Sequence, residues 1–282
     1  EYPQQDVAVY DYLGVQSERI LPGYRYLVSW KDLYTTYGDS CEFLTQMMGA
    51  YGYVGEVFQV ETETFRAQKE SQPGRQPEGQ EDIEAMMMGR STELERLRFS
   101  DNLTHGYLHK PWTAYEHPTY GDVEIGGWVK LSSRIGAPFT LIDLVHRNSM
   151  AVLFTAKHTP EVSLDVTEVK EVGTGLYRVR SRLSNSKAIP SMSYRAQKVK
   201  LSPKDMLMVE GGSRAKVVAG GLLTDAYRDS VSYKKFRPEL QFVVVPGFGK
   251  VEHQFLVEGK GEVTIRYESR HAGKLSQTIQ LK

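Results

Sequence analysis

Hydrophobic and polar residues follow two different patterns along the chain, and the change falls near residue 160. From residue 161 onward, apolar residues alternate with polar ones, as in residues 162–166, 177–183 and 263–267. Short turns rich in Gly, Asn and Ser separate these runs. Alternation with period two and frequent turns is typical of antiparallel sheets. The pattern therefore predicts an all-β, Ig-like sandwich over residues 161–282.

Residues 1–100 have a mixed pattern that predicts an α/β fragment. Residues 24–32 and 53–60 alternate as strands do, and a helix is predicted over residues 41–48 between them. Residues 66–82 are rich in Gln, Pro, Gly and charge, which predicts a flexible surface loop. A second helix is predicted over residues 83–99.

A connecting segment, residues 101–160, separates the two regions. Its first part is a loop rich in His, Pro and Tyr, and residues 123–129 look extended. Apolar residues at helical spacing predict a helix over residues 139–157. The predicted domains are therefore residues 1–100, 101–160 and 161–282.

Composition and charge exclude several classes of protein. The chain is 40% hydrophobic, and 35 basic residues balance 35 acidic ones. Such a chain can bury a core, and it lacks the basic excess that a general nucleic-acid binder needs. Its apolar runs are too short to predict a membrane span. The single cysteine, Cys41, excludes an internal disulfide.

Glu56 is the first candidate for a chemical role. On the predicted strand, its neighbours on the same face are Val54 and Phe58. A carboxylate among apolar side chains is costly to desolvate unless it is paired or functional, and burial raises its pKa towards that of a general base. A strand edge or a buried ion pair would explain the same pattern without any catalytic function.

The residues around Glu56 resemble the last active-site segment of zinc carboxypeptidases of the carboxypeptidase A type. That segment carries a tyrosine, a turn, an acidic–aromatic pair that opens a helix, and a strand with the catalytic glutamate. The matching residues here are Tyr34, Gly38-Asp39-Ser40, Glu42-Phe43 and Tyr53-Val54-Gly55-Glu56-Val57. Tyr34 precedes Glu56 by 22 positions and Ser40 precedes it by 16, which are the spacings of the family.

The resemblance implies a fold, a site and a reaction. Residues 1–100 would be the C-terminal part of a larger mixed sheet with helices. Glu56 would be the general base that activates a zinc-bound water, and Tyr34 would hydrogen-bond the substrate. Cys41, with Ser40 beside it, would lie at the floor of the substrate side-chain pocket. The reaction would be hydrolysis of C-terminal residues from peptides or proteins, with zinc as the cofactor of the intact protein.

A second stretch, residues 112–128, is similar to a segment that follows the peptidase domain in large extracytoplasmic bacterial members of that family. In those proteins an Ig-like domain comes next. The resemblance therefore implies an extracytoplasmic location, which means periplasmic, associated with the outer membrane, or secreted.

The zinc ligands of the family are not found before Tyr34. The family uses a His-x-x-Glu pair and a later His upstream of this segment, whereas the first histidine here is His105. His158 and Glu161 form a His-x-x-Glu, but it follows Glu56 and contains Pro160, so we interpret it as a chance match. The chain also starts without an initiator Met. We therefore expect a C-terminal portion of a longer product that binds no catalytic zinc and is inactive alone, and whose sheet is completed by the missing N-terminal half or another chain.

A second hypothesis assigns the chain no catalytic role. In it, the sandwich is a binding or assembly module of the cell envelope, and residues 1–100 are a degenerate peptidase remnant. The row of Arg178, Arg180 and Arg182 on one strand face would be a solvated face or a surface for a partner.

Overall fold

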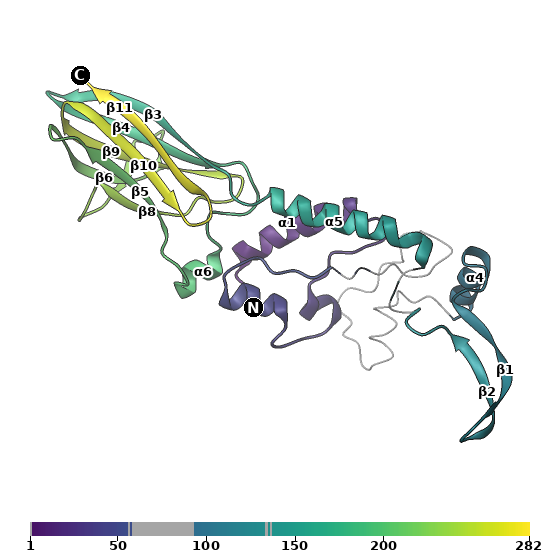
Figure 1. The fold of residues 1–282 in the computed structure, drawn as a ribbon. Coiled ribbons are helices and arrows are strands. Elements are labelled where there is room, and N and C mark those ends of the chain that lie inside the picture. The colour runs from purple at the N-terminus through teal and green to yellow at the C-terminus, as the bar shows by residue number, and fades with distance from the viewer. Residues whose placement is uncertain (1, 56, 58–92, 133–134, 136) are drawn as a thin grey trace. The chain divides into compact units, whose positions relative to one another are not determined.

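The structure, a computed structural model, describes residues 2–55, 57, 93–132, 135 and 137–282 (Figure 1). These residues form two compact units, and each unit combines segments that are not consecutive in the sequence. The first unit comprises Glu1–Leu13, Ser40–Gly52 and Thr155–Lys282, and the second comprises Gly14–Asp39 and Tyr53–Phe154. Segments that are distant in the sequence therefore share one unit.

Nine antiparallel strands in the first unit form two sheets (Figure 1). The five-stranded sheet has the order β3 (Val162–Gly173), β4 (Leu176–Asn185), β9 (Gly249–Gly259), β6 (Ala215–Asp225) and β7 (Ser230–Tyr233). The four-stranded sheet has the order β11 (Gly273–Leu281), β10 (Gly261–Ser269), β5 (Asp205–Gly211) and β8 (Leu240–Val243). The chain is thus mostly β-sheet with a few helices, and the strands predicted after residue 160 are confirmed.

One hydrophobic core joins the two sheets. Along β4, buried residues alternate strictly with partly exposed ones, as the period of two requires. Val179 and Leu183 of β4, Phe255 of β9 and Ile265 and Tyr267 of β10 are all 0% exposed and belong to one cluster. The sheets therefore pack face to face as a sandwich.

Residues 2–52 are helical or irregular, which differs from the prediction for this region. The helices are α1 (Gln4–Ile20), the π-helical turn Ser29–Leu33, α2 (Ser40–Glu42) and the π-helical turn Phe43–Met47. Helix α1 was not predicted, whereas the helix predicted over 41–48 is confirmed. Among the described residues of 1–100, none lies in a strand, so the mixed sheet is not seen there.

The strand predicted over residues 24–32 is wrong, and the reason is local. The side chain of Asp32 accepts a hydrogen bond of 2.7 Å from the backbone N–H of Val28 and closes the turn that follows. Leu27 and Trp30 stay 43% and 59% exposed. A strand is stable only when a neighbour pairs with its backbone, and the alternating pattern alone does not supply that neighbour. Most of the strand predicted over 53–60 lies outside the described residues.

The second unit contains two further helices and a hairpin. Helix α4 (Glu93–Leu103) overlaps the end of the helix predicted over 83–99, whose earlier part lies outside the described residues. Helix α5 (Leu141–Lys157), preceded by the 3₁₀ turn Pro138–Thr140, occupies the segment predicted to be helical and continues into the first unit. None of the described helices is long and apolar enough to cross a membrane.

The segment interpreted as a loop before residue 121 is instead the first strand of a hairpin. β1 (His109–His117) pairs with β2 (Gly121–Trp128) in a two-stranded antiparallel sheet. At its base, Trp128 packs against the small core of Phe99, Leu108 and Ala137, and Arg96 lies 4.1 Å from the centre of the Trp128 ring. The rest of the hairpin extends away from that core.

Candidate functional site

The residues predicted to form the peptidase site occupy different parts of the structure. Tyr34 lies in the second unit, on extended backbone directly after the first π-helical turn, and is 37% exposed. Ser40 and Cys41 lie in the first unit at the start of α2, with Ser40 exposed and Cys41 half-buried. Glu56 lies outside the described residues. The grouping of these side chains therefore stays a prediction.

The turn before α2 has the form that the sequence predicts. Gly38 has a φ of +73°, a conformation that glycine adopts at little cost. The hydroxyl of Thr36 donates a hydrogen bond of 2.7 Å to the carboxylate of Asp39. Helical backbone begins two residues after Gly38, at Ser40.

The His-x-x-Glu at His158 and Glu161 has structural roles. The Nδ1 atom of His158 accepts a hydrogen bond of 3.3 Å from the backbone N–H of Ala188. Glu161 pairs with Lys187, with 2.9 Å between the carboxylate oxygen and Nζ. Burial and the charge of Lys187 lower the pKa of His158. Across the described residues, His, Cys, Asp and Glu nowhere gather in a group of three that could hold a metal.

A buried polar cluster is centred on Asp6 in the first turn of α1. Its carboxylate is 2% exposed and accepts three hydrogen bonds: from the hydroxyl of Tyr51 at 2.8 Å and from the backbone N–H groups of Tyr194 and Arg195 at 2.9 and 2.8 Å. Burial and the nearby carboxylate raise the pKa of Tyr51. The cluster joins α1, residues 40–52 and the start of α6 (Tyr194–Val199) within the first unit.

A groove of about 560 Å³ lies beside this cluster. One face of α1 lines it, with residues of α6 and of the segments around β8 and β9. At one end, the ring of Tyr12 contacts those of His158 and Phe248, with centroid distances of 5.4 and 5.0 Å. The residues that line the groove are mostly apolar, and Asp6 is the one carboxylate among them. The groove could therefore hold an apolar group, but it lacks a pair of groups for acid–base catalysis.

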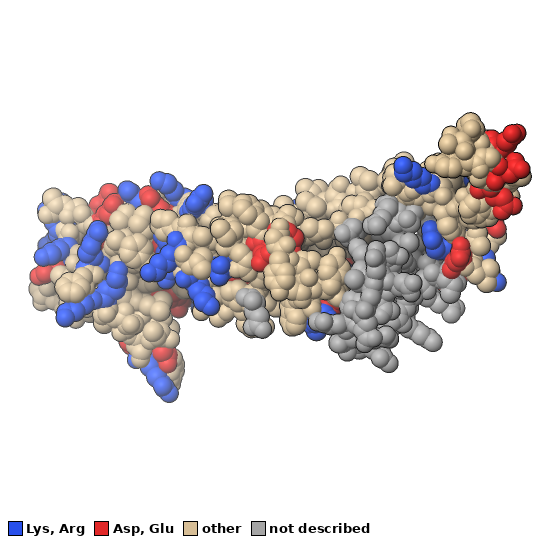
Figure 2. Space-filling view, turned by 90° about the horizontal axis from the view of Figure 1, so that it is seen from below, with Lys and Arg blue, Asp and Glu red and all other residues tan. Residues whose placement is uncertain are grey.

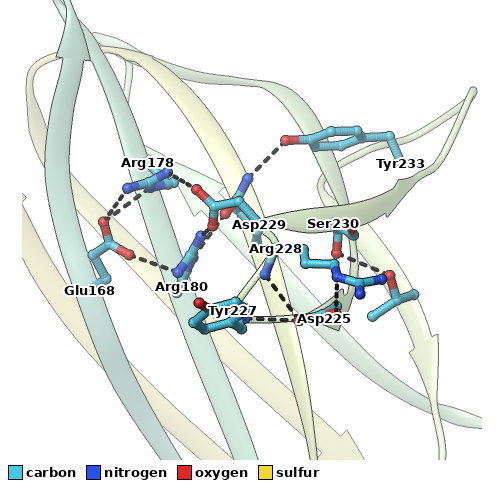
Figure 3. A network of polar contacts seen from close by, with 11 residues as sticks. Glu168, Arg178, Arg180, Asp225, Tyr227, Arg228, Asp229, Ser230 and Tyr233 are labelled. Atoms are coloured by element: carbon cyan, nitrogen blue, oxygen red, sulfur yellow. Dashed lines mark hydrogen bonds and ion pairs between the residues drawn. The ribbon is translucent and has the colours of Figure 1, made fainter.

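Two arginines of the row on β4, Arg178 and Arg180, are neutralised by carboxylates (Figure 3). Arg178 donates to Glu168 at 2.8 and 3.0 Å and to Asp229 at 2.8 Å. Arg180 pairs with both of the same carboxylates and donates to Gln254 at 2.8 Å. Because these guanidinium groups are already engaged, the network fastens the β6–β7 loop to the sheet rather than presenting an open anion site.

His253 occupies an inward position of β9, opposite Ser181 of β4. It is 3% exposed, and neither its Nδ1 atom nor the Ser181 hydroxyl has a hydrogen-bond partner within the described residues. Burial lowers the pKa of His253 to about 4. The imidazole is therefore neutral at physiological pH and acts as a core side chain.

The stability of the sandwich is expected to fall as the pH drops from about 6.5 to 4. The unfolded chain binds the His253 proton near its ordinary pKa of 6.5, whereas the folded state binds it only near pH 4. The neutral His253 side chain therefore makes its full contribution to the free energy of unfolding above pH 6.5. About 3 kcal/mol of that free energy is lost when the pH falls to 4. Urea denaturation at several pH values should show this loss, and the variant His253→Leu should lack it.

His271→Leu is the matched control, because His271 is exposed. An equal dependence on pH in the His253→Leu variant and in the unchanged protein would contradict the assignment.

The charges of the chain are strongly segregated, although they sum to zero. Residues 161–282 carry 21 Lys and Arg against 13 Asp and Glu, a formal charge of +8, and residues 1–160 carry −8. Figure 2 shows Lys and Arg side chains, with fewer Asp and Glu, over the sandwich, and a group of Asp and Glu side chains over the hairpin. The net charge of zero is therefore the sum of a basic C-terminal part, residues 161–282, and an acidic N-terminal part, residues 1–160.

Comparisons with known proteins give one match to a family model, in the C-terminal region, and several matches to solved structures. Residues 161–280 match the model of a family described as a domain of unknown function (DUF8731). No curated protein sequence matches the chain. The chain is similar to the solved GAE domain of yeast GGA1, with 12% identity and a TM-score of 0.25 over 44% of this chain and 99% of that one. It is also similar to a conjugative transposon lipoprotein from Bacteroides eggerthii, with 7% identity and a TM-score of 0.25 over 43% and 96% of the two chains. At these scores the likeness carries no argument about function.

Proposed function

We propose that this chain is the C-terminal portion of an extracytoplasmic zinc metallocarboxypeptidase. It supplies Glu56 and Tyr34 to the active site, and sequence outside these 282 residues supplies the zinc ligands. Residues 1–100 belong to the enzyme's α/β domain and residues 161–282 form an attached Ig-like domain. The substrates are the C-termini of peptides or proteins.

The order and spacing of Tyr34, Ser40 and Glu56 carry this proposal. The turn at Gly38 and the helical backbone that begins at Ser40 are consistent with it, because the resemblance implies a turn followed by a helix that opens with an acidic–aromatic pair. The pair here is Glu42 and Phe43.

In the proposed reaction, this chain handles protons and substrate. The Glu56 carboxylate accepts a proton from the attacking water and passes it to the leaving amine. The Tyr34 hydroxyl donates a hydrogen bond to bound substrate. The described residues do not fit a zinc site, since they present no suitable group of ligands, so no step through the metal is assigned to them.

Glu56→Gln tests the proposal directly in a protein that includes the upstream region. Loss of the general base is expected to lower kcat at least about 100-fold while the peptide still binds, as seen by unchanged retention of a slowly hydrolysed substrate. Glu258→Gln, which removes an exposed carboxylate from β9 of the sandwich, is the matched control. Unchanged hydrolysis in Glu56→Gln would show that Glu56 is not the base.

The metal content of the 282-residue chain is a second test. We expect less than stoichiometric zinc and no peptidase activity in the purified chain, and both should appear when the upstream region is present. Stoichiometric zinc with activity in the chain alone would overturn the proposal that the zinc ligands come from sequence outside these 282 residues.

The segregated charge favours a second candidate function, a binding or assembly module of the cell envelope without catalysis. A sandwich of formal charge +8 attached to an acidic region suits association with charged partners. The sequence upstream separates the two functions: a His-x-x-Glu followed by a further His supports the enzyme, and substituted ligands support the module.

A further inference from the structure

The β1–β2 hairpin has two chemically different faces. Residues that pair directly across an antiparallel sheet share a face, and neighbours along a strand alternate between faces. The pairs Tyr115–Val123 and Thr113–Ile125 therefore share one face, and the pairs Glu116–Asp122 and Ala114–Glu124 share the other.

One face is apolar and solvent-exposed. Tyr115 and Ile125 are 45% and 49% exposed. The His117 ring contacts those of Tyr115 and Tyr120, with centroid distances of 6.2 and 4.8 Å, and Tyr120 is 78% exposed. The described helices and strands leave this face largely uncovered. Aromatic side chains normally stabilise a protein or an interface by being buried.

The opposite face is acidic, and no basic side chain that the structure describes pairs with it. Glu116 and Asp122 lie directly across from each other, and Glu124 is the next residue on that face. Residues 111–129 contain no Lys or Arg, and none of the three carboxylates has an ion pair with a residue that the structure describes. Like charges directly opposite each other destabilise a sheet, so a cationic partner would relieve this face.

The two edges of the hairpin differ in their capacity to pair. β1 contains Pro111, which has no N–H to donate, and its register shifts between Lys110 and Thr113. β2 contains no proline. Within the described part of the chain, β2 pairs with β1 alone, so its other edge is open to a further strand. Asp122 and Glu124 on that strand would repel a second copy of β2.

We propose that the edge of β2 binds an extended protein segment in which apolar and basic residues alternate. Side chains of an added strand alternate between the two faces of the sheet. Its apolar residues extend the face of Tyr115 and Ile125, and its Lys or Arg residues neutralise the face of Glu116 and Asp122. A third strand also stabilises the hairpin, since isolated two-stranded sheets are marginal in water.

The test uses the full chain and three labelled ten-residue peptides, with affinity measured by fluorescence anisotropy. In the first peptide Lys alternates with Val and Tyr; the second has the same composition with the Lys residues in one block; in the third Glu replaces Lys. We expect the first to bind at least about tenfold more tightly than the others, and to bind more weakly as salt is raised. Hydrogen exchange of the β2 amides should slow when it binds.

Charge reversal tests the face assignment. The triple variant Glu116→Lys, Asp122→Lys, Glu124→Lys should lose affinity for the Lys peptide at least about tenfold and prefer the Glu peptide. The matched control, Glu171→Lys, Glu258→Lys, Glu262→Lys, makes the same net change at exposed positions of the sandwich and should keep the original preference.

Several results would overturn the proposal: no binding of the alternating peptide, equal binding of the blocked peptide, or equal effects of the two triple variants. Unfolding of the hairpin in the first variant would appear as loss of affinity for both charged peptides. In that case Ile125→Asn in the unchanged acidic background must still weaken binding of the Lys peptide, and an unchanged affinity would refute the proposal.

Discussion

Replacing Phe255 by Ala is expected to destabilise the sandwich by about 3–5 kcal/mol. Phe255 is 0% exposed and lies on β9, between β4 and β6 in the five-stranded sheet. It pairs with Val179 on one side and Gly220 on the other. A side chain at Gly220 would come within 2.7 Å of the Phe255 ring, so the glycine makes room for the aromatic ring.

The size of this effect follows from the poor ability of the site to collapse. Two hydrogen-bonded sheets hold the backbone on each side of the core, so truncation leaves a cavity and also loses the transfer free energy of the ring. The urea midpoint of the transition that exposes the β9 amides to hydrogen exchange should report the change.

Phe236→Ala is the matched control, because Phe236 is 74% exposed and its truncation should change stability by less than about 0.5 kcal/mol. Similar losses in the two variants would mean that Phe255 does not occupy the core.

Replacing Asp6 by Ala is expected to destabilise the first unit by about 3–5 kcal/mol. The change leaves the Tyr51 hydroxyl and the backbone N–H groups of Tyr194 and Arg195 without their acceptor. Hydrogen bonds to a buried carboxylate are stronger than neutral ones, and the variant removes the one acceptor that all three donors share.

Hydrogen exchange of the Tyr194 and Arg195 amides, together with urea denaturation, measures this effect. Asp6→Asn keeps one acceptor oxygen and should lose less stability than Asp6→Ala. Asp101→Ala, at an exposed position of α4, is the control and should be nearly neutral. Unchanged exchange at Tyr194 and Arg195 in Asp6→Ala would contradict the role of the carboxylate.

The strands of the sandwich could be predicted because each carries its own signal. Residues 176–185 alternate in sequence as β4 alternates in burial, and the same holds for β10. His253 also follows this pattern, since it shares its face with Phe255 and Val257, and inspection of that face could have identified a buried histidine. The segment that forms α5 likewise has helical spacing along its whole length.

The Asp6 cluster could not be predicted in the same way. Asp6 and Tyr194 are 188 positions apart, and nothing in either local sequence indicates the other. The strand predicted over 24–32 failed for a related reason: Tyr26 donates its backbone N–H to Glu18 rather than to a neighbouring strand. A local hydrophobic pattern shows which element a segment can form. Whether the element forms depends on the groups that its backbone and side chains bind in the folded chain.

The sequence by itself determined the period of the sandwich strands and of α5, the start of the sandwich near residue 161 and the spacing of Tyr34, Ser40 and Glu56. These properties depend on neighbouring residues and on the fixed repeat of the backbone. Only the tertiary structure decided that α1, residues 40–52 and α6 meet at one buried carboxylate, and that the arginines of β4 are already paired. The physical reason is that such contacts join segments distant in the chain, and their free energy exists only after folding has brought them together.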